Sequence, residues 1–135
     1  MTETILKYEW DSEHFGWAVV GYESIADNGI VIIPDEIDRD GLENIVVSIR
    51  ENAFGECENI KELHIGKNVS GIGKFAFANC FALEYIYFNA ESCADFFNSE
   101  EPFYNAGKNG KGIHVEIGRD AVGLPALLFD IQTDP

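Results

Sequence analysis

The chain has 135 residues, which is enough for one ordinary domain and too few for two. Apolar residues make up 46% of it, including ten Phe, five Tyr and two Trp, so it can fill a core and is not expected to be disordered. The formal net charge of −15 repels phosphate backbones and anionic membrane surfaces, which argues against nucleic acid and lipid head groups as partners.

Targeting signals and disulfides are also not expected. No apolar run approaches the length of about 18 residues needed to span a bilayer, and the opening "MTETILKYEW" lacks the basic start and apolar stretch of a secretory signal. The sequence as written therefore predicts a cytoplasmic protein, whereas a trimmed chain would be compatible with the cell surface or secretion. Cys57, Cys80 and Cys93 are odd in number and form no CxxC pair, so we expect free thiols and no zinc site.

The first segment, residues 1–28, is predicted to be a capping β-hairpin. The stretches "TILKYEW" and "FGWAVVGYES" alternate apolar and polar residues on either side of "DSEHFG". A repeat fold needs such a cap because its first unit would otherwise expose one end of the core and one strand edge. We expect Trp10, Phe15 and Trp17 to cover that end.

Residues 29–135 are predicted to form repeats in a single domain with the cap. A shift of 23 places aligns apolar or small residues with one another: Ala53 with Ala76, Phe54 with Phe77, Cys57 with Cys80, Leu63 with Ile86, and Ile65 with Phe88. A fixed period of this length is typical of a solenoid, in which each coil buries its apolar side against the next coil. The alternation at the end of each unit predicts a short strand. The motifs "ENAF" and "KFAF" predict a short helical turn on the outer face, with their Ala and Phe pointing inward.

Two weaker copies extend the period in both directions. Val31 and Ile33 match Leu63 and Ile65 in a first coil, and Val115 and Ile117 match Ile86 and Phe88 in a fourth. The stretch "DRDGLENI" holds the extra residues of the first coil as a loop. In the return path of the third coil, we expect Phe103 and Tyr104 near the places of Ala76 and Phe77, and Gly107 near that of Cys80.

The central stretch "VVSIRENAFGECENIKELHIGKNVSGIGKFAFANCFALEYIYF" resembles the BspA-type leucine-rich repeat of bacteria, whose unit runs AFxxCxxLxxIxIxxxVxxIG. The resemblance extends over about residues 29–129. It implies an α/β repeat solenoid: a short right-handed coil with a parallel sheet on one face and short helices or turns on the other. Members of the family are often surface proteins of host-associated bacteria that bind other proteins, and they offer no catalytic or cofactor-binding residues to carry over.

The outward side chains of the four predicted strands form two neighbouring columns. One runs Ile32, His64, Tyr87, Glu116, and the other runs Ile30, Glu62, Tyr85, His114. We predict that Glu62, His64, Tyr85, Tyr87, His114 and Glu116 bind a protein or peptide, because Tyr combines rigid contact area with a hydroxyl group. The alternative is that Tyr and His simply suit half-buried strands.

Other chemistries have weaker support. His64 and His114 lie two strands apart, about 10 Å by strand spacing, so one zinc ion cannot join them. Nothing basic adjoins Cys57 or Cys80 in the sequence, so we interpret them as core residues, not a redox pair. The acidic stretch "PDEIDRD", residues 34–40, lacks the Gly and terminal Glu of a twelve-residue calcium loop, which favours a solvated loop.

The sequence thus favours a non-enzymatic interaction module without a cofactor or metal. No Ser, His and Asp arrangement, phosphate-binding loop or pair of buried carboxylates can be located with specificity. The alternative is a structural unit that associates with itself through the sheet edge or the last coil, where Leu127, Leu128 and Phe129 precede no recognisable C-terminal cap.

Overall fold

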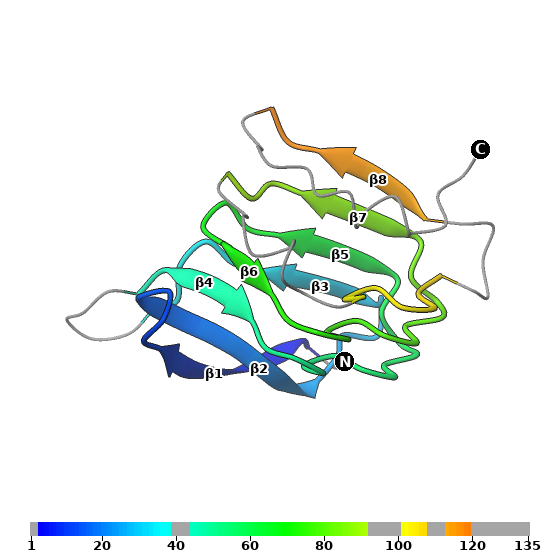
Figure 1. The fold of residues 1–135 in the computed structure, drawn as a ribbon. Helices are drawn as coiled ribbons and strands as arrows, with labels where there is room; N and C mark the ends of the chain where they lie inside the picture. The colour runs from blue at the N-terminus through cyan, green and yellow to red at the C-terminus, as the bar shows by residue number, and fades with distance from the viewer. Residues whose placement is uncertain (1–2, 39–43, 92–100, 108–112, 120–135) are drawn as a thin grey trace.

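The fold consists of two four-stranded sheets around one apolar core (Figure 1). It is seen in a computed structural model that describes residues 3–38, 44–91, 101–107 and 113–119. The front sheet contains β3 (Ile30–Ile33), β5 (Glu62–Ile65), β7 (Tyr85–Phe88) and β8 (His114–Ile117), in that order. The back sheet has the order β1 (Ile5–Asp11), β2 (Gly16–Ser24), β4 (Val46–Ile49), β6 (Gly71–Ile72).

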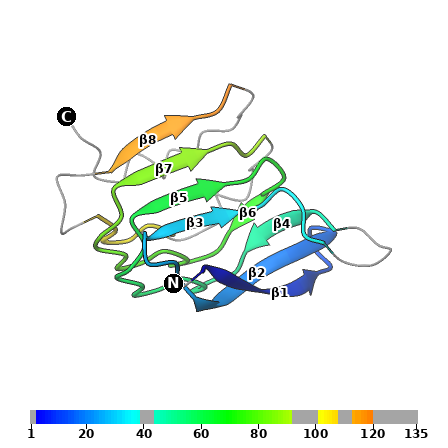
Figure 2. The same ribbon diagram turned by 180° about the vertical axis from the view of Figure 1, so that it is seen from behind.

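The front sheet is wholly parallel, and its strands lie in register (Figure 2). Val31, Leu63, Ile86 and Val115 form one aligned row, and Ile33, Ile65, Phe88 and Ile117 form the other. In β3, β5 and β7 these residues are at most 1% exposed, because every second side chain of a strand points to the same side. The short repeat solenoid predicted from the spacing is confirmed, including both weaker copies.

The residues of β8 are less buried than those of the other front strands. In the described sheet, β8 is an edge strand and pairs only with β7. Ile117 holds the register position of Phe88 but is 47% exposed, and Val115 is only half-buried. The fourth coil therefore follows the predicted alignment without matching the burial of the central coils.

Where a coil passes from the back sheet to the front sheet, as from β4 to β5 and from β6 to β7, the described residues form turns and not helices. The turns span residues 51–56, 74–79 and 102–107. The first two each contain a pair of left-handed residues four places apart, Asn52 and Glu56 (φ 58° and 61°) and Phe75 and Asn79 (φ 56° and 59°). The corresponding pair of the third is Glu101, just before the turn, and Asn105 (φ 49° and 58°). Hydrogen bonds join successive turns, for example from Phe54 N to Ala76 O at 2.7 Å. Of the two possibilities expected here, short helices or turns, the chain uses turns.

Aromatic rings inside these turns stack into a continuous ladder. Tyr22 lies 5.6 Å from Phe54, Phe54 lies 5.0 Å from Phe77, and Phe77 lies 5.2 Å from Phe103, measured between ring centroids. The rings are almost parallel, with interplanar angles of 4–8°. Because Tyr22 belongs to β2, the ladder joins the N-terminal hairpin to the repeats.

The return path of the third coil is one residue out of the predicted alignment. Phe103, not Tyr104, stacks on Phe77, and Phe77 N donates to Pro102 O where Phe54 N donates to Ala76 O. Phe103 is 7% exposed, whereas Tyr104 is 46% exposed. The spacing of aromatic residues cannot distinguish two adjacent ones, so the prediction for this segment was wrong by one place.

The hairpin is present, but two of its aromatic side chains are not where they were expected. β1 and β2 pair antiparallel, and β2 continues the back sheet by pairing parallel with β4. Trp10 is 43% exposed and Phe15 is 71% exposed, so the expectation that they cover the core was wrong. Trp17 is half-buried and meets Trp10 edge-on, with ring centroids 5.5 Å apart. Val19, fully buried in β2, packs in the core cluster instead. The division into a cap of residues 1–28 and repeats from 29 stays a prediction.

Gly73→Ala should lower the free energy of unfolding by about 1–3 kcal/mol. A Cβ atom at Gly73 would lie 2.4 Å from the backbone N of Glu51 in the preceding coil, and backbone cannot rotate away as a side chain can. Gly21→Ala is the matched control, because its Cβ would meet only Ala53 O, at 3.8 Å. Chemical denaturation measures both, and equal stability of the two variants would contradict the close approach of successive coils.

Candidate binding surface

The outward side of the front sheet, called here the tyrosine face, carries all six residues predicted to bind a partner. Strand pairing aligns Ile30, Glu62, Tyr85 and His114 in one column and Ile32, His64, Tyr87 and Glu116 in the other. The register of both columns is as expected from the sequence. Since the opposite side of β3, β5 and β7 is fully buried, the backbone that presents this face is held rigidly.

The centre of the tyrosine face is a layered group of rings. His64 stacks on Tyr87, with centroids 4.6 Å apart and planes 18° apart. Glu62 Oε2 lies 2.7 Å from His64 Nε2, so the carboxylate fixes the orientation of the imidazole. One side of the Tyr87 ring is thus covered by a neighbour that is itself hydrogen-bonded.

A second group of rings, on β7 and β8, also pairs a tyrosine with a histidine and a glutamate, but it is more exposed to solvent. The Tyr85 ring lies 6.5 Å from that of Tyr87 and meets His114 edge-on at 5.9 Å. His114 Nε2 lies 3.3 Å from Glu116 Oε1, and both of these residues are exposed. Tyr85 is 41% exposed, so an aromatic surface in contact with water runs across β7.

The electrostatic character of the tyrosine face is negative. None of its eight residues is Lys or Arg, and Glu62 and Glu116 flank the central tyrosine on β5 and β8. The pKa of Tyr87 is raised, first by loss of solvent around the hydroxyl and then by the charges of Glu62 and Glu116. The face therefore disfavours additional negative charge, whether it comes from a phenolate or from a ligand.

A hollow adjoins the tyrosine face at β3. It has a volume of about 610 Å³ and lies between the start of β1 and the outward side of β3. Its apolar lining comes from Leu6, Tyr8, Ala26, Ile30 and Ile32. Ile32 is 57% exposed, and because Ile30 and Ile32 belong to the two columns, the hollow and the tyrosine face form one continuous surface.

Metal and thiol chemistry find no support among the described residues. No group of three or more His, Cys, Asp or Glu side chains within them is arranged to hold a metal ion. Of the acidic stretch 34–40, Asp35 accepts a hydrogen bond from Lys67 N at 2.8 Å, and residues 39 and 40 lie outside the description. Cys57 and Cys80 are buried, and burial, then the neighbouring Cys57, raises the pKa of Cys80 to about 12. Cys93 also lies outside the described residues.

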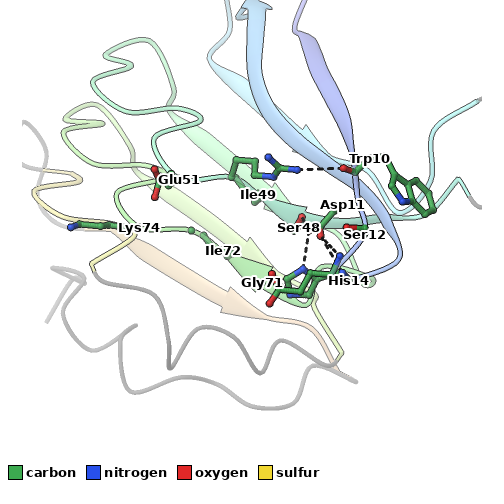
Figure 3. A pocket seen from close by; sticks show the side chains of 13 residues that line it. Trp10, Asp11, Ser12, His14, Ser48, Ile49, Glu51, Gly71, Ile72 and Lys74 are labelled. Atoms are coloured by element: carbon green, nitrogen blue, oxygen red, sulfur yellow. Dashed lines mark hydrogen bonds and ion pairs between the residues drawn. The ribbon is translucent and has the colours of Figure 1, made fainter.

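A second hollow, of about 660 Å³, lies on the back sheet beside the hairpin turn and was not predicted (Figure 3). Asp11 is only 8% exposed there and accepts hydrogen bonds from the Ser48 hydroxyl, from the backbone N–H groups of Glu13 and His14, and from His14 Nδ1. Burial by itself raises the pKa of Asp11, but the bonds from Ser48 and His14 and the charge of His14 outweigh it and hold the pKa below its ordinary value. The cluster joins the hairpin to β4.

The cluster contains Ser, His and Asp, but the carboxylate occupies its centre. Ser48 and His14 both bond to Asp11 Oδ2, at a His14 Nδ1 distance of 2.8 Å. Activation of a serine requires an imidazole bonded to the hydroxyl and a carboxylate behind that imidazole. The order seen here fits a structural anchor. Ser48 was the one available sequence signal, since it is a polar residue inside the apolar strand "VVSI".

The described residues contain no helix long and apolar enough to cross a membrane. Comparison with crystal structures supports the fold. A leucine-rich repeat protein from Bacteroides ovatus ATCC 8483 superposes with a TM-score of 0.55 at 23% identity, over 90% of this chain and 38% of the other. One from Bacteroides capillosus ATCC 29799 gives 0.52 at 19% identity, over 87% and 97%. The chain thus spans well under half the length of the first of these proteins.

Sequence comparison identifies the family. No curated protein matches the chain. The family described as "BspA type Leucine rich repeat region (6 copies)" matches residues 37–106, which is 70 of the 135 residues. The matched segment contains the two central coils and the turn that follows them. The chain therefore belongs to the BspA-type leucine-rich repeat family.

Proposed function

We propose that the protein is a non-enzymatic interaction module that binds a protein or peptide segment on its tyrosine face. The observation that supports this most directly is the pair of outward rings on β7, Tyr85 and Tyr87, presented side by side by a strand with a fully buried inner side. Rigid aromatic side chains lose little entropy on binding and dominate the energetics of many interfaces. Repeat solenoids use such extended faces for recognition.

The class of partner follows from the charge of the face. A net charge of −15 and the two face glutamates oppose nucleic acid, whose phosphates need Lys and Arg. The non-enzymatic assignment is supported by the raised pKa of Cys80 and by the position of Asp11 between Ser48 and His14. Neither arrangement supplies an activated nucleophile.

The alternative is a structural unit that associates with itself. The apolar residues on which that hypothesis rests, Leu127, Leu128 and Phe129, lie outside the described residues, but Ile117 on the end strand β8 is 47% exposed. Light scattering at high protein concentration tests this alternative directly. A monomer would count against it, and a discrete dimer that survives Tyr85→Ala/Tyr87→Ala would favour it over binding on the tyrosine face.

Tyr85→Ala/Tyr87→Ala should weaken binding by about 30-fold or more, as loss of aromatic anchors does. The measurement is selection from a random peptide library on the wild type, followed by dissociation constants for the enriched peptides on both proteins. We expect the double variant to lose no more than about 1 kcal/mol of stability, because Tyr85 is exposed and Tyr87, although half-buried, lies on the outward side of the sheet and outside the core cluster.

Tyr104→Ala is the matched control. Its ring is 46% exposed, close to the 41% of Tyr85, but it lies on the turns and packs beside Phe75. This variant should bind the enriched peptides as the wild type does. Unfolding of Tyr85→Ala/Tyr87→Ala would show that the rings belong to the scaffold, and peptides that bind it unchanged would remove the tyrosine face as the site.

A further inference from the structure

We infer, on the basis of the binding function proposed above, that the tyrosine face takes an extended segment carrying an apolar side chain and, about three or four residues away, a lysine or arginine. The apolar side chain occupies the hollow beside β3, and the cation lies over Tyr87 on the side of Glu116.

The apolar end of the site is the hollow of about 610 Å³. Its walls come from separate elements, Leu6 and Tyr8 on β1 and Ile30 and Ile32 on β3. Thr4 fixes their separation, because its hydroxyl donates to Ile30 O at 2.9 Å and accepts from Ala26 N at 2.8 Å. Ile32, beside the hollow, is 57% exposed. An apolar side chain of a ligand that enters the hollow would bury its own surface and that of Ile32, which favours binding.

The position of the cation follows from the neighbours on the two sides of the Tyr87 ring. In its column the order is His64, Tyr87, Glu116. The His64 ring lies against one side at 4.6 Å, whereas the next position on the other side holds a carboxylate. A cation there would meet the negative ring and a carboxylate together, the combination that favours Arg or Lys near an aromatic side chain.

The charges around this position agree with a basic ligand. Tyr87 already senses Glu62 and Glu116, whose charges contribute to the rise of its pKa. None of the eight residues of the tyrosine face is Lys or Arg, and Glu3 borders the hollow at the other end. An acidic segment would therefore be repelled along the whole face, while a basic one is attracted by the net charge of −15.

The separation of the two ends gives the spacing of the ligand residues. From β3 to a point between β7 and β8 is two to three strand steps of about 4.8 Å, or roughly 12 Å. An extended chain advances about 3.3 Å per residue. A segment lying across the strands therefore places its anchor and its cation about three or four residues apart.

The test uses the peptides that a random library yields on the wild type but not on Tyr85→Ala/Tyr87→Ala. We expect them to share Leu, Ile or Phe three or four residues from Arg or Lys. Glu62→Gln/Glu116→Gln should weaken their binding about five- to tenfold, with a smaller dependence on salt than in the wild type. Glu56→Gln/Glu58→Gln, two exposed acids on the turn side, changes the net charge equally and should weaken binding less than twofold.

The possible outcomes separate this inference from the proposed function. Peptides that need Tyr85 and Tyr87 but carry no basic residue, or that tolerate Glu62→Gln/Glu116→Gln, would overturn the inference and leave binding on the tyrosine face in place. Equal weakening in both glutamine variants would also overturn it, because the attraction would then be that of the whole molecule. If no peptide distinguishes the wild type from the tyrosine variant, the proposed function itself fails.

Discussion

Phe77→Ala is expected to lower the free energy of unfolding by about 3–5 kcal/mol, the usual cost of deleting a large aromatic side chain from a core. The Phe77 ring is 0% exposed and lies between Phe54 and Phe103, at 5.0 and 5.2 Å. Its loss leaves a cavity between two stacked rings that hydrogen-bonded turns hold in place, so the coils cannot easily close the gap.

Chemical denaturation measures this effect, and Phe15→Ala is the matched control. Phe15 is 71% exposed, so the same deletion there should change stability by less than about 0.5 kcal/mol. Hydrogen exchange adds a second observable, because each coil contacts only its neighbours and damage in the middle should lower protection on both sides. A Phe77→Ala variant within about 1 kcal/mol of the wild type would contradict the ring ladder as the centre of the core.

The front sheet was predictable because its signal is repeated. Leu63 and Ile65 recur as Ile86 and Phe88, and strand alternation leaves one arrangement that buries all four. The same register then assigned the outward columns, including Tyr85 and Tyr87. Repetition thus specified both the scaffold and the position of the candidate site. It does not identify the partner that binds there.

The back sheet and the return path were harder because their signals are short or ambiguous. Of the strands contributed by the coils, β6 has two residues, Gly71 and Ile72, too few for any alternation to be visible. Phe103 and Tyr104 are adjacent aromatic residues, so an insertion nearby leaves the inward one undetermined. Phe15 is apolar yet exposed, with a φ of 58° in the hairpin turn, which shows that composition alone does not place a turn residue.

The Asp11 cluster was missed for a different reason. It joins Asp11 to Ser48, 37 residues apart, through a contact that neither the period nor the strand pattern encodes. In a chain with 24 acidic residues, one more Asp in a turn resembles a solvated surface residue. Its burial becomes visible only when β2 is placed beside β4.

Asp11→Ala is expected to cost about 2–3 kcal/mol at neutral pH, because hydrogen bonds to a charged acceptor are worth more than neutral ones and their donors would be left without it. Ser48 and His14 would lose the carboxylate that joins the hairpin to the first complete coil. Glu13→Ala removes one acidic side chain from the same turn and changes the net charge equally, yet leaves the Glu13 N–H free to donate to Asp11. It should change stability by less than about 0.5 kcal/mol.

The effect of Asp11→Ala should also depend on pH in a defined direction. Because the pKa of Asp11 is lower in the folded protein than in the unfolded chain, its contribution is complete above the unfolded pKa of about 3.9 and is lost as the pH falls through the folded pKa. The difference in unfolding free energy between wild type and Asp11→Ala should thus be large at pH 5 and shrink as the pH falls below about 4 and the carboxylate is protonated. Glu13→Ala, measured over the same pH range, is the control. Its difference in unfolding free energy from the wild type should stay small at every pH. For Asp11→Ala, a difference that stays constant down to pH 2 would mean that Asp11 stabilises the hairpin by packing, with its charge contributing nothing.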